Sequence, residues 1–139
     1  MIHIFNDTET RRLPVKHAVD TVQNVFENEM AGSPFNVNVI YTTTEYITEL
    51  NENYLGHSGS TDVITFPLSE EGDESIDGEI YICVEVAEAQ ANDFGVKRDN
   101  ELIRLVAHGA LHLCGYNDET DEKRNIMHNL ENKYMISKS

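Results

Sequence analysis

The stretch that most constrains the fold and chemistry of this chain is residues 105–118, with the sequence LVAHGALHLCGYND. Residues 105–114 contain no Asp, Glu, Lys or Arg and are apolar on nearly all sides, which is typical of a buried helix. On such a helix, His108 and His112 lie one turn apart on the same face. Gly115 then allows the chain to reverse, because glycine reaches positive φ without steric cost, and the reversal can return Asp118 to the two histidines.

Two imidazoles on one buried face need partners, because an unsatisfied buried polar group costs about 1–3 kcal/mol. A shared metal ion meets this need, and two helical histidines four residues apart are a zinc-binding arrangement. We therefore predict one Zn²⁺ per chain, held by His108, His112 and Asp118. The alternative is two core histidines, each hydrogen-bonded to a backbone carbonyl. Cys114 follows His112 by two residues and points to a different side of the helix.

The same spacing occurs in the zinc-peptidase motif H-E-x-x-H-x-x-G-x-x-H. In this chain Gly109 replaces the glutamate that serves as general base, and Asp118 replaces the last histidine. The catalytic group would then be metal-bound water, acting by itself or with another carboxylate or histidine. A zinc peptidase is an alternative function, and Gly109 argues against it.

Length and composition predict one globular domain over residues 1–139, since 40% of the residues are hydrophobic and 25% are charged. No apolar run approaches the roughly 18 residues of a membrane span, so no membrane partner is predicted. The first residues lack the architecture of a signal peptide, which favours a cytoplasmic location. Cys83 and Cys114 form no C-x-x-C pair and are predicted to be buried, reduced thiols.

The formal net charge is −15, and no Lys or Arg occurs between Lys16 and Lys97. A chain this acidic should repel polyanions at long range, because nucleic-acid affinity comes largely from cationic contacts. If the substrate is a nucleic acid, either the basic residues must gather at the site or a basic partner must assist.

Hydrophobic periodicity predicts four strands and five helices in the order βαβαββααα. The predicted strands are 2–5, 35–42, 61–66 and 78–84, and the predicted helices are about 14–31, 42–54, 85–94, 99–114 and 121–137. Thr42 and Glu45 look like a capping box for the second helix. Pro67 ends the third strand and places it near a sheet edge, where it can pair with the fourth strand across an acidic loop. The pattern predicts an α+β fold with helices on a mixed four-stranded sheet.

Three blocks of the sequence resemble one protein family. HGALHLCGYND at 108–118 is similar to the signature H-G-x-L-H-L-x-G-Y-D-H. LNENYLGHSGSTDVITFP at 50–67 and GEIYIC at 78–83 are similar to a second and a third block, the latter with the form Gly-Asp-Ile-x-Ile. The family is that of the YbeY endoribonucleases, which mature ribosomal RNA in bacteria, and the order of the blocks is the family's order.

Two positions depart from the family pattern. Asp118 stands where the family has a third histidine ligand, and a carboxylate there leaves a site of lower positive charge. Alternatively, Asp118 caps the last helix and Glu119 or Asp121 supplies the third ligand. Leu55 stands where the family has an arginine that would contact phosphate. His57, two residues later, is a candidate catalytic replacement or an ordinary exposed loop histidine.

The resemblance implies a single-strand-specific, metal-dependent endoribonuclease acting in small-subunit (16S) rRNA 3′-end maturation and ribosome quality control. The implied partners are single-stranded rRNA and, as further candidates, small ribosomal subunit proteins or assembly factors. The alternative from another class is a ribosome-associated binding protein with a structural metal and weak or no hydrolysis. The net charge, Leu55 and Asp118 favour this alternative. The sequence indicates neither the substrate-binding residues nor the oligomeric state.

Overall fold

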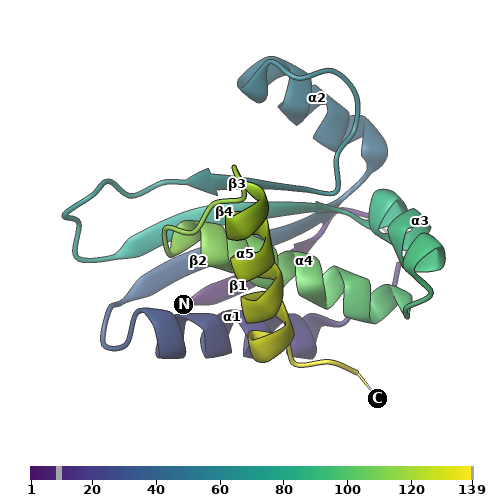
Figure 1. Ribbon diagram of the computed structural model, residues 1–139. Coiled ribbons are helices and arrows are strands. Elements are labelled where there is room, and N and C mark those ends of the chain that lie inside the picture. Colours follow the sequence, from purple (N-terminus) through teal and green to yellow (C-terminus); the bar gives the residue numbers. More distant parts are fainter. Residues whose placement is uncertain (9–10, 139) are drawn as a thin grey trace.

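The computed structural model describes residues 1–8 and 11–138. Within them the elements follow the predicted order (Figure 1): β1 Ile2–Asn6, α1 Val15–Glu29, β2 Phe35–Thr42, α2 Thr44–Leu55, β3 Val63–Pro67, β4 Ile76–Cys83, α3 Val84–Phe94, α4 Arg98–Leu113 and α5 Asp121–Tyr134. The predicted α+β fold, with a four-stranded mixed sheet and five helices, is confirmed. No helix of the described residues is both long enough and apolar enough to cross a membrane.

The sheet has the strand order β1-β2-β4-β3. β1, β2 and β4 run parallel to one another, whereas β3 is antiparallel to β4. β3 and β4 therefore form the predicted hairpin, with β3 at the sheet edge. Pro67 pairs with Gly78 at the end of this ladder, and an edge strand tolerates proline because its outer side needs no ladder hydrogen bond.

Side-chain alternation along β4 sends residues to two different cores. Ile80 and Ile82 belong to the main core, which the sheet forms with α1, α4 and α5. Cys83 belongs to a smaller core with Ile47 and Leu50 of α2, against which Tyr81 packs. Figure 1 accordingly shows α1, α4 and α5 on one side of the sheet and α2 on the other. Because successive side chains of a strand point to opposite faces of the sheet, β4 contributes to a core on each face.

The predicted capping box of α2 is wrong by one residue. Thr42 continues the β2 ladder and pairs with Cys83 of β4, so it is not available as a cap. Thr43 is the N-cap, and its side chain accepts a hydrogen bond from the backbone N–H of Tyr46 at 3.3 Å. Pairing with a distant strand therefore decided the start of this helix.

The last helix ends at Tyr134, earlier than predicted. After it the chain is extended, and the backbone N–H of Ile136 donates to Thr21 Oγ1 of α1 at 3.0 Å. The backbone N–H of Lys138 donates to Asn100 Oδ1 of α4 at 2.7 Å. These contacts with other helices replace the hydrogen bonds that another helical turn would have made.

Helix α4 approaches the sheet most closely at Gly109. A Cβ atom there would lie 2.6 Å from Cγ2 of Ile80, closer than real Cβ contacts. The helix that carries both histidines is therefore held against β4 at a distance that only glycine allows at this position.

We expect Gly109→Ala to lower the stability by about 1–3 kcal/mol, because an extra methyl group in a filled core forces its neighbours to move. The change would be destabilising even though alanine favours helix over glycine. Thermal unfolding of the metal-free protein measures the effect, with Asn129→Ala on the exposed face of α5 as control. A Gly109→Ala protein that melts at or above the wild-type temperature would contradict this packing.

Candidate metal centre

Helix α4 presents His108 and His112 on one face, one turn apart, as the spacing predicts. Their Nε2 atoms lie 3.0 Å apart, and the two rings meet edge to face. Both side chains are partly buried, with exposed fractions of 20% for His108 and 27% for His112. The two rings thus direct one nitrogen each to a shared point that solvent can reach.

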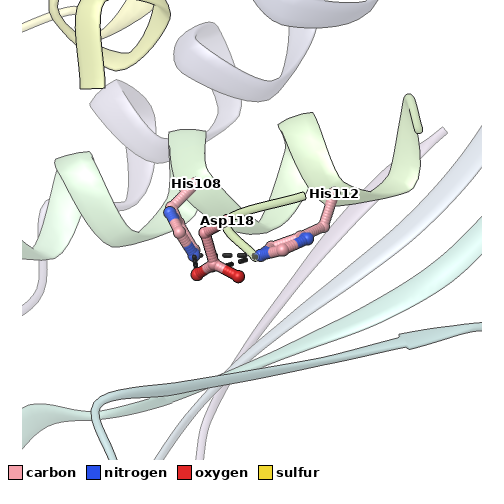
Figure 2. Close-up of side chains that lie close together, drawn as sticks. All are labelled: His108, His112 and Asp118. Carbon is pink, nitrogen blue, oxygen red and sulfur yellow. Dashed lines mark hydrogen bonds and ion pairs between the residues drawn. The ribbon is translucent and has the colours of Figure 1, made fainter. Parts of the chain in front are cut away.

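The chain reverses after α4 and brings Asp118 to the same point (Figure 2). Gly115 has a backbone φ of +104°, a conformation that residues with a Cβ atom rarely adopt. Asp118 Oδ2 lies 3.7 Å from His108 Nε2 and 3.9 Å from His112 Nε2. The three ligand atoms lie within 4.8 Å of one another, so these residues could together hold a metal ion.

Hydrogen bonds anchor the loop that carries Asp118. The Tyr116 hydroxyl donates to Glu29 Oε1 of α1 at 2.6 Å, and the Tyr134 hydroxyl of α5 donates to the other oxygen of this carboxylate. These two hydrogen bonds lower the pKa of Glu29. Arg124 donates to the backbone carbonyl of Asp118 at 3.1 Å. These contacts tie the loop to α1 and α5.

A buried carboxylate on α5 orients His108. Glu131 Oε2 lies 2.7 Å from His108 Nδ1, so that nitrogen carries the proton and Nε2 keeps its lone pair toward the site. Arg104 donates to Glu131 Oε1 at 3.3 Å. Glu131 is 6% exposed. The sequence interpretation missed it, although its position between Met127 and Tyr134 on the apolar face of the last helix was a usable signal.

The histidine pKa values shift in opposite directions. Burial opposes protonation of His108, but the hydrogen bond to Glu131 and the charges of Glu131 and Asp118 outweigh it and raise the pKa. Burial and the neighbouring His108 lower the pKa of His112. Nearby on α4, burial raises the pKa of Glu101 to about 7, although the charge of Arg104 opposes the shift. The surroundings of His108 are thus rich in carboxylates, which favours a cation between the rings.

The three residues line one wall of an open cleft of about 360 Å³. Residues 61–65 and Pro67 of the β3 region form the other wall, and Leu55 lies at the rim. Asp62 lines it as well, with its carboxylate held by the Val63 backbone N–H at 2.8 Å and by Gln90 at 3.1 Å. None of the described lining residues is Lys or Arg. Basic side chains therefore do not gather among the described lining residues, and of the two conditions set for a nucleic-acid substrate the help of a basic partner stays a prediction.

The other predicted candidates lie outside this group. His57 is exposed in the loop after α2 and does not line the cleft. Glu119 and Asp121 are exposed, and Asp121 is ion-paired with Arg124. The alternative role of Asp118 as helix cap is wrong, because Thr120 caps α5 and accepts from the Lys123 N–H at 3.1 Å.

Both cysteines are free thiols, as predicted, but only Cys83 is fully buried. Cys114 is partly buried, and burial raises the pKa of its thiol to about 12. A thiol that holds its proton so strongly is a poor metal ligand, because the thiolate is the form that binds metal.

The fold and the site define a class: α+β proteins in which an apolar helix and the loop after it present a candidate single-ion centre to an open cleft. Within this class the chain belongs to the YbeY family, since the family described as "Endoribonuclease YbeY" matches residues 3–138. The family that the three sequence blocks indicated is therefore confirmed.

Individual relatives agree with this assignment. The chain is 38% identical over 134 residues to the endoribonuclease YbeY of Chlorobaculum tepidum, covering 96% of this chain and 95% of that protein. It is 41% identical over 107 residues to that of Flavobacterium psychrophilum, covering 77% and 73%. The solution structure of a Thermotoga maritima protein is similar with a TM-score of 0.66 and 32% identity, covering 97% of this chain and 87% of that one.

Proposed function

We propose that this chain is a zinc-dependent, single-strand-specific endoribonuclease that acts in 16S rRNA 3′-end maturation and ribosome quality control. It would act in the cytoplasm as one domain over residues 1–139, with small ribosomal subunit proteins or assembly factors as further partners. The observation that carries the proposal is the convergence of His108, His112 and Asp118 at an open cleft. Membership of a family whose relatives are named endoribonucleases supplies the substrate class.

The donor set fits zinc. Two imidazole nitrogens and one carboxylate, with room for a further ligand from solvent, form a common catalytic zinc arrangement. The His108–Glu131 contact at 2.7 Å is the outer hydrogen bond that zinc-bound histidines usually make. When bound, zinc supplies Lewis acidity toward a phosphodiester oxygen and lowers the pKa of water.

The residues of the chain position the reaction. His108 and His112 hold their Nε2 atoms toward the cleft, and Asp118 directs a carboxylate oxygen to the same point as the third ligand. Asp62 is a second carboxylate on the cleft wall, and we assign to its carboxylate oxygens the acceptance of the proton that a water molecule would give up as it attacks the phosphorus atom. This role replaces that of the peptidase glutamate, which a chain with Gly109 lacks.

A zinc peptidase is the less favoured activity. The Ile80 side chain would lie 2.6 Å from a Cβ atom at position 109, so a glutamate does not fit there without displacing that side chain. A binding protein with a structural metal is favoured by one observation, the absence of Lys and Arg among the described residues that line the cleft.

One set of cleavage assays separates these functions. The purified chain is incubated with labelled single-stranded RNA, with the corresponding duplex and with casein, each with and without EDTA and then with added zinc. We expect cleavage of the single strand alone, its loss in EDTA and its return with zinc. Casein cleavage would establish the peptidase. No cleavage, with a melting temperature that EDTA lowers, would establish the structural metal.

We expect Asp118→Ala to reduce the bound zinc well below one per chain, because one of three protein ligands is lost, while the metal-free protein melts as the wild type does. Elemental analysis and thermal unfolding measure the two effects. Asp121→Ala, three residues later, is the matched control and should retain zinc. Full zinc content in Asp118→Ala would assign the third ligand to another residue.

We expect Leu55→Arg to strengthen RNA binding, because it places a cation at the rim of a cleft whose described lining has none. One added phosphate contact should steepen the dependence of log affinity on log salt by about 0.7 for a single strand. Fluorescence anisotropy at several salt concentrations measures the slope. Val96→Arg, at an exposed position away from the cleft, is the control, and an equal gain there would show only a general charge effect.

A further inference from the structure

A second hollow lies at the β3 edge, on the side of the sheet that α2 covers. It has a volume of about 340 Å³, and we call it the aromatic groove; its main lining residues are Tyr46, Tyr54, Phe66, Leu68, Glu79 and Tyr81. Tyr54 is 71% exposed, Leu68 60% and Tyr46 42%. Large apolar side chains grouped on a surface in this way usually mark a binding site, because their exposure to water is unfavourable.

The rings of the aromatic groove contact one another mainly by their edges. Tyr54 and Phe66 meet at 80° with centroids 6.2 Å apart, and Phe66 and Tyr81 meet at 84° and 5.7 Å. Tyr46 is tilted by 39° against Tyr81 at 6.1 Å. In an edge-to-face pair one ring lies with its edge against the face of the other, so the faces of the first ring are not covered by its partner. The groove therefore offers flat aromatic surface to a planar ligand.

The aromatic groove adjoins the cleft of the candidate metal centre. Along β3, Val63 and Thr65 line the cleft while Phe66 lines the groove, and Pro67 lines both. At the end of α2, Tyr54 lines the groove and the next residue, Leu55, lines the cleft. A polynucleotide in the cleft that continues past the edge of β3 would therefore enter the groove.

Charge decides which part of a nucleotide fits the groove. All its lining residues come from the interval between Lys16 and Lys97, which contains no Lys or Arg. Glu79, which accepts a hydrogen bond from the Tyr81 hydroxyl at 3.2 Å, adds a carboxylate. This surface repels phosphate but accepts the face of a base, and base–aromatic stacking needs no cation.

From these contacts we propose that the aromatic groove binds an unpaired nucleobase of the RNA strand whose phosphodiester lies in the neighbouring cleft. The inference rests on the proposed endoribonuclease function and extends it to a substrate subsite. It would also explain the proposed single-strand specificity, because the faces of a base in a duplex are covered by its neighbours in the stack. An acidic chain thus obtains RNA affinity from stacking in place of ionic contacts.

The test measures binding separately from cleavage. The probe is a short fluorescein-labelled single-stranded RNA with 2′-O-methyl riboses and phosphorothioate linkages, which resists hydrolysis, titrated with the zinc-loaded protein. We expect Tyr54→Leu to weaken binding roughly tenfold, on the scale of losing one stacked base, and Tyr46→Leu to act in the same direction. Tyr54→Phe keeps the ring and should bind as the wild type does. Phe5→Ala, at the exposed β1 edge of the sheet, is the matched control.

The outcomes separate the subsite from the function. Wild-type affinity in Tyr54→Leu and Tyr46→Leu, in a protein that binds and cleaves RNA, would overturn the subsite and leave the groove to a protein partner. An equal loss of affinity for a duplex probe would also overturn it, because a duplex offers no free base. A wild-type protein that neither binds nor cleaves RNA would instead refute the proposed function itself.

Discussion

His112→Ala is expected to abolish metal binding and RNA cleavage together. The variant keeps one imidazole and one exposed carboxylate, which leaves too few ligands to hold zinc against solvent. Loss of the metal removes several kcal/mol of transition-state stabilisation, so cleavage should fall by roughly a thousandfold or more. Elemental analysis of the purified variant and gel assays on labelled single-stranded RNA measure the two losses.

His57→Ala is the control for this variant, since His57 is a histidine of an exposed loop outside the cleft. It should keep its zinc. If it keeps zinc but loses cleavage, His57 has the catalytic role that the missing arginine left open. Stoichiometric zinc in His112→Ala would show that the ion binds at another place in the protein.

The second large effect is expected for Glu131→Gln, which preserves size but removes the charge beside His108. Loss of an outer carboxylate partner typically lowers metal affinity about 10–100-fold. Arg104 would also lose its ion pair with Glu131 at 3.3 Å, but it keeps Asn132 Oδ1 at 2.6 Å and is partly exposed, so the free energy of unfolding should fall by about 1–2 kcal/mol.

Two measurements separate these effects. Competition with a chromogenic chelator gives the zinc affinity, and denaturant unfolding of the metal-free protein gives the stability. Glu122→Gln, at an exposed position of the same helix, should change neither. A Glu131→Gln protein that binds zinc as tightly as the wild type does would show that the His108–Glu131 contact is only structural.

Local sequence patterns predicted most of the fold because each pattern has a local cause. The alternation in β4 reflects which residues face each core, and the proline at the end of β3 marks an edge strand. Thr42 shows where such reasoning failed, because a ladder partner 41 residues away in the chain, Cys83, kept it in β2. Glu131 was missed for a similar reason, since it contacts His108, which lies 23 residues earlier in the chain.

The sequence by itself determined the family, the element order and the helical spacing that brings His108 and His112 to one face. These features depend on short-range geometry, which a single stretch of chain encodes. Only the tertiary structure decided that Glu131 orients His108, that Gly109 is pressed against Ile80, and that the aromatic groove adjoins the cleft. Each of these contacts joins separate elements, and their distances depend on how the helices pack on the sheet.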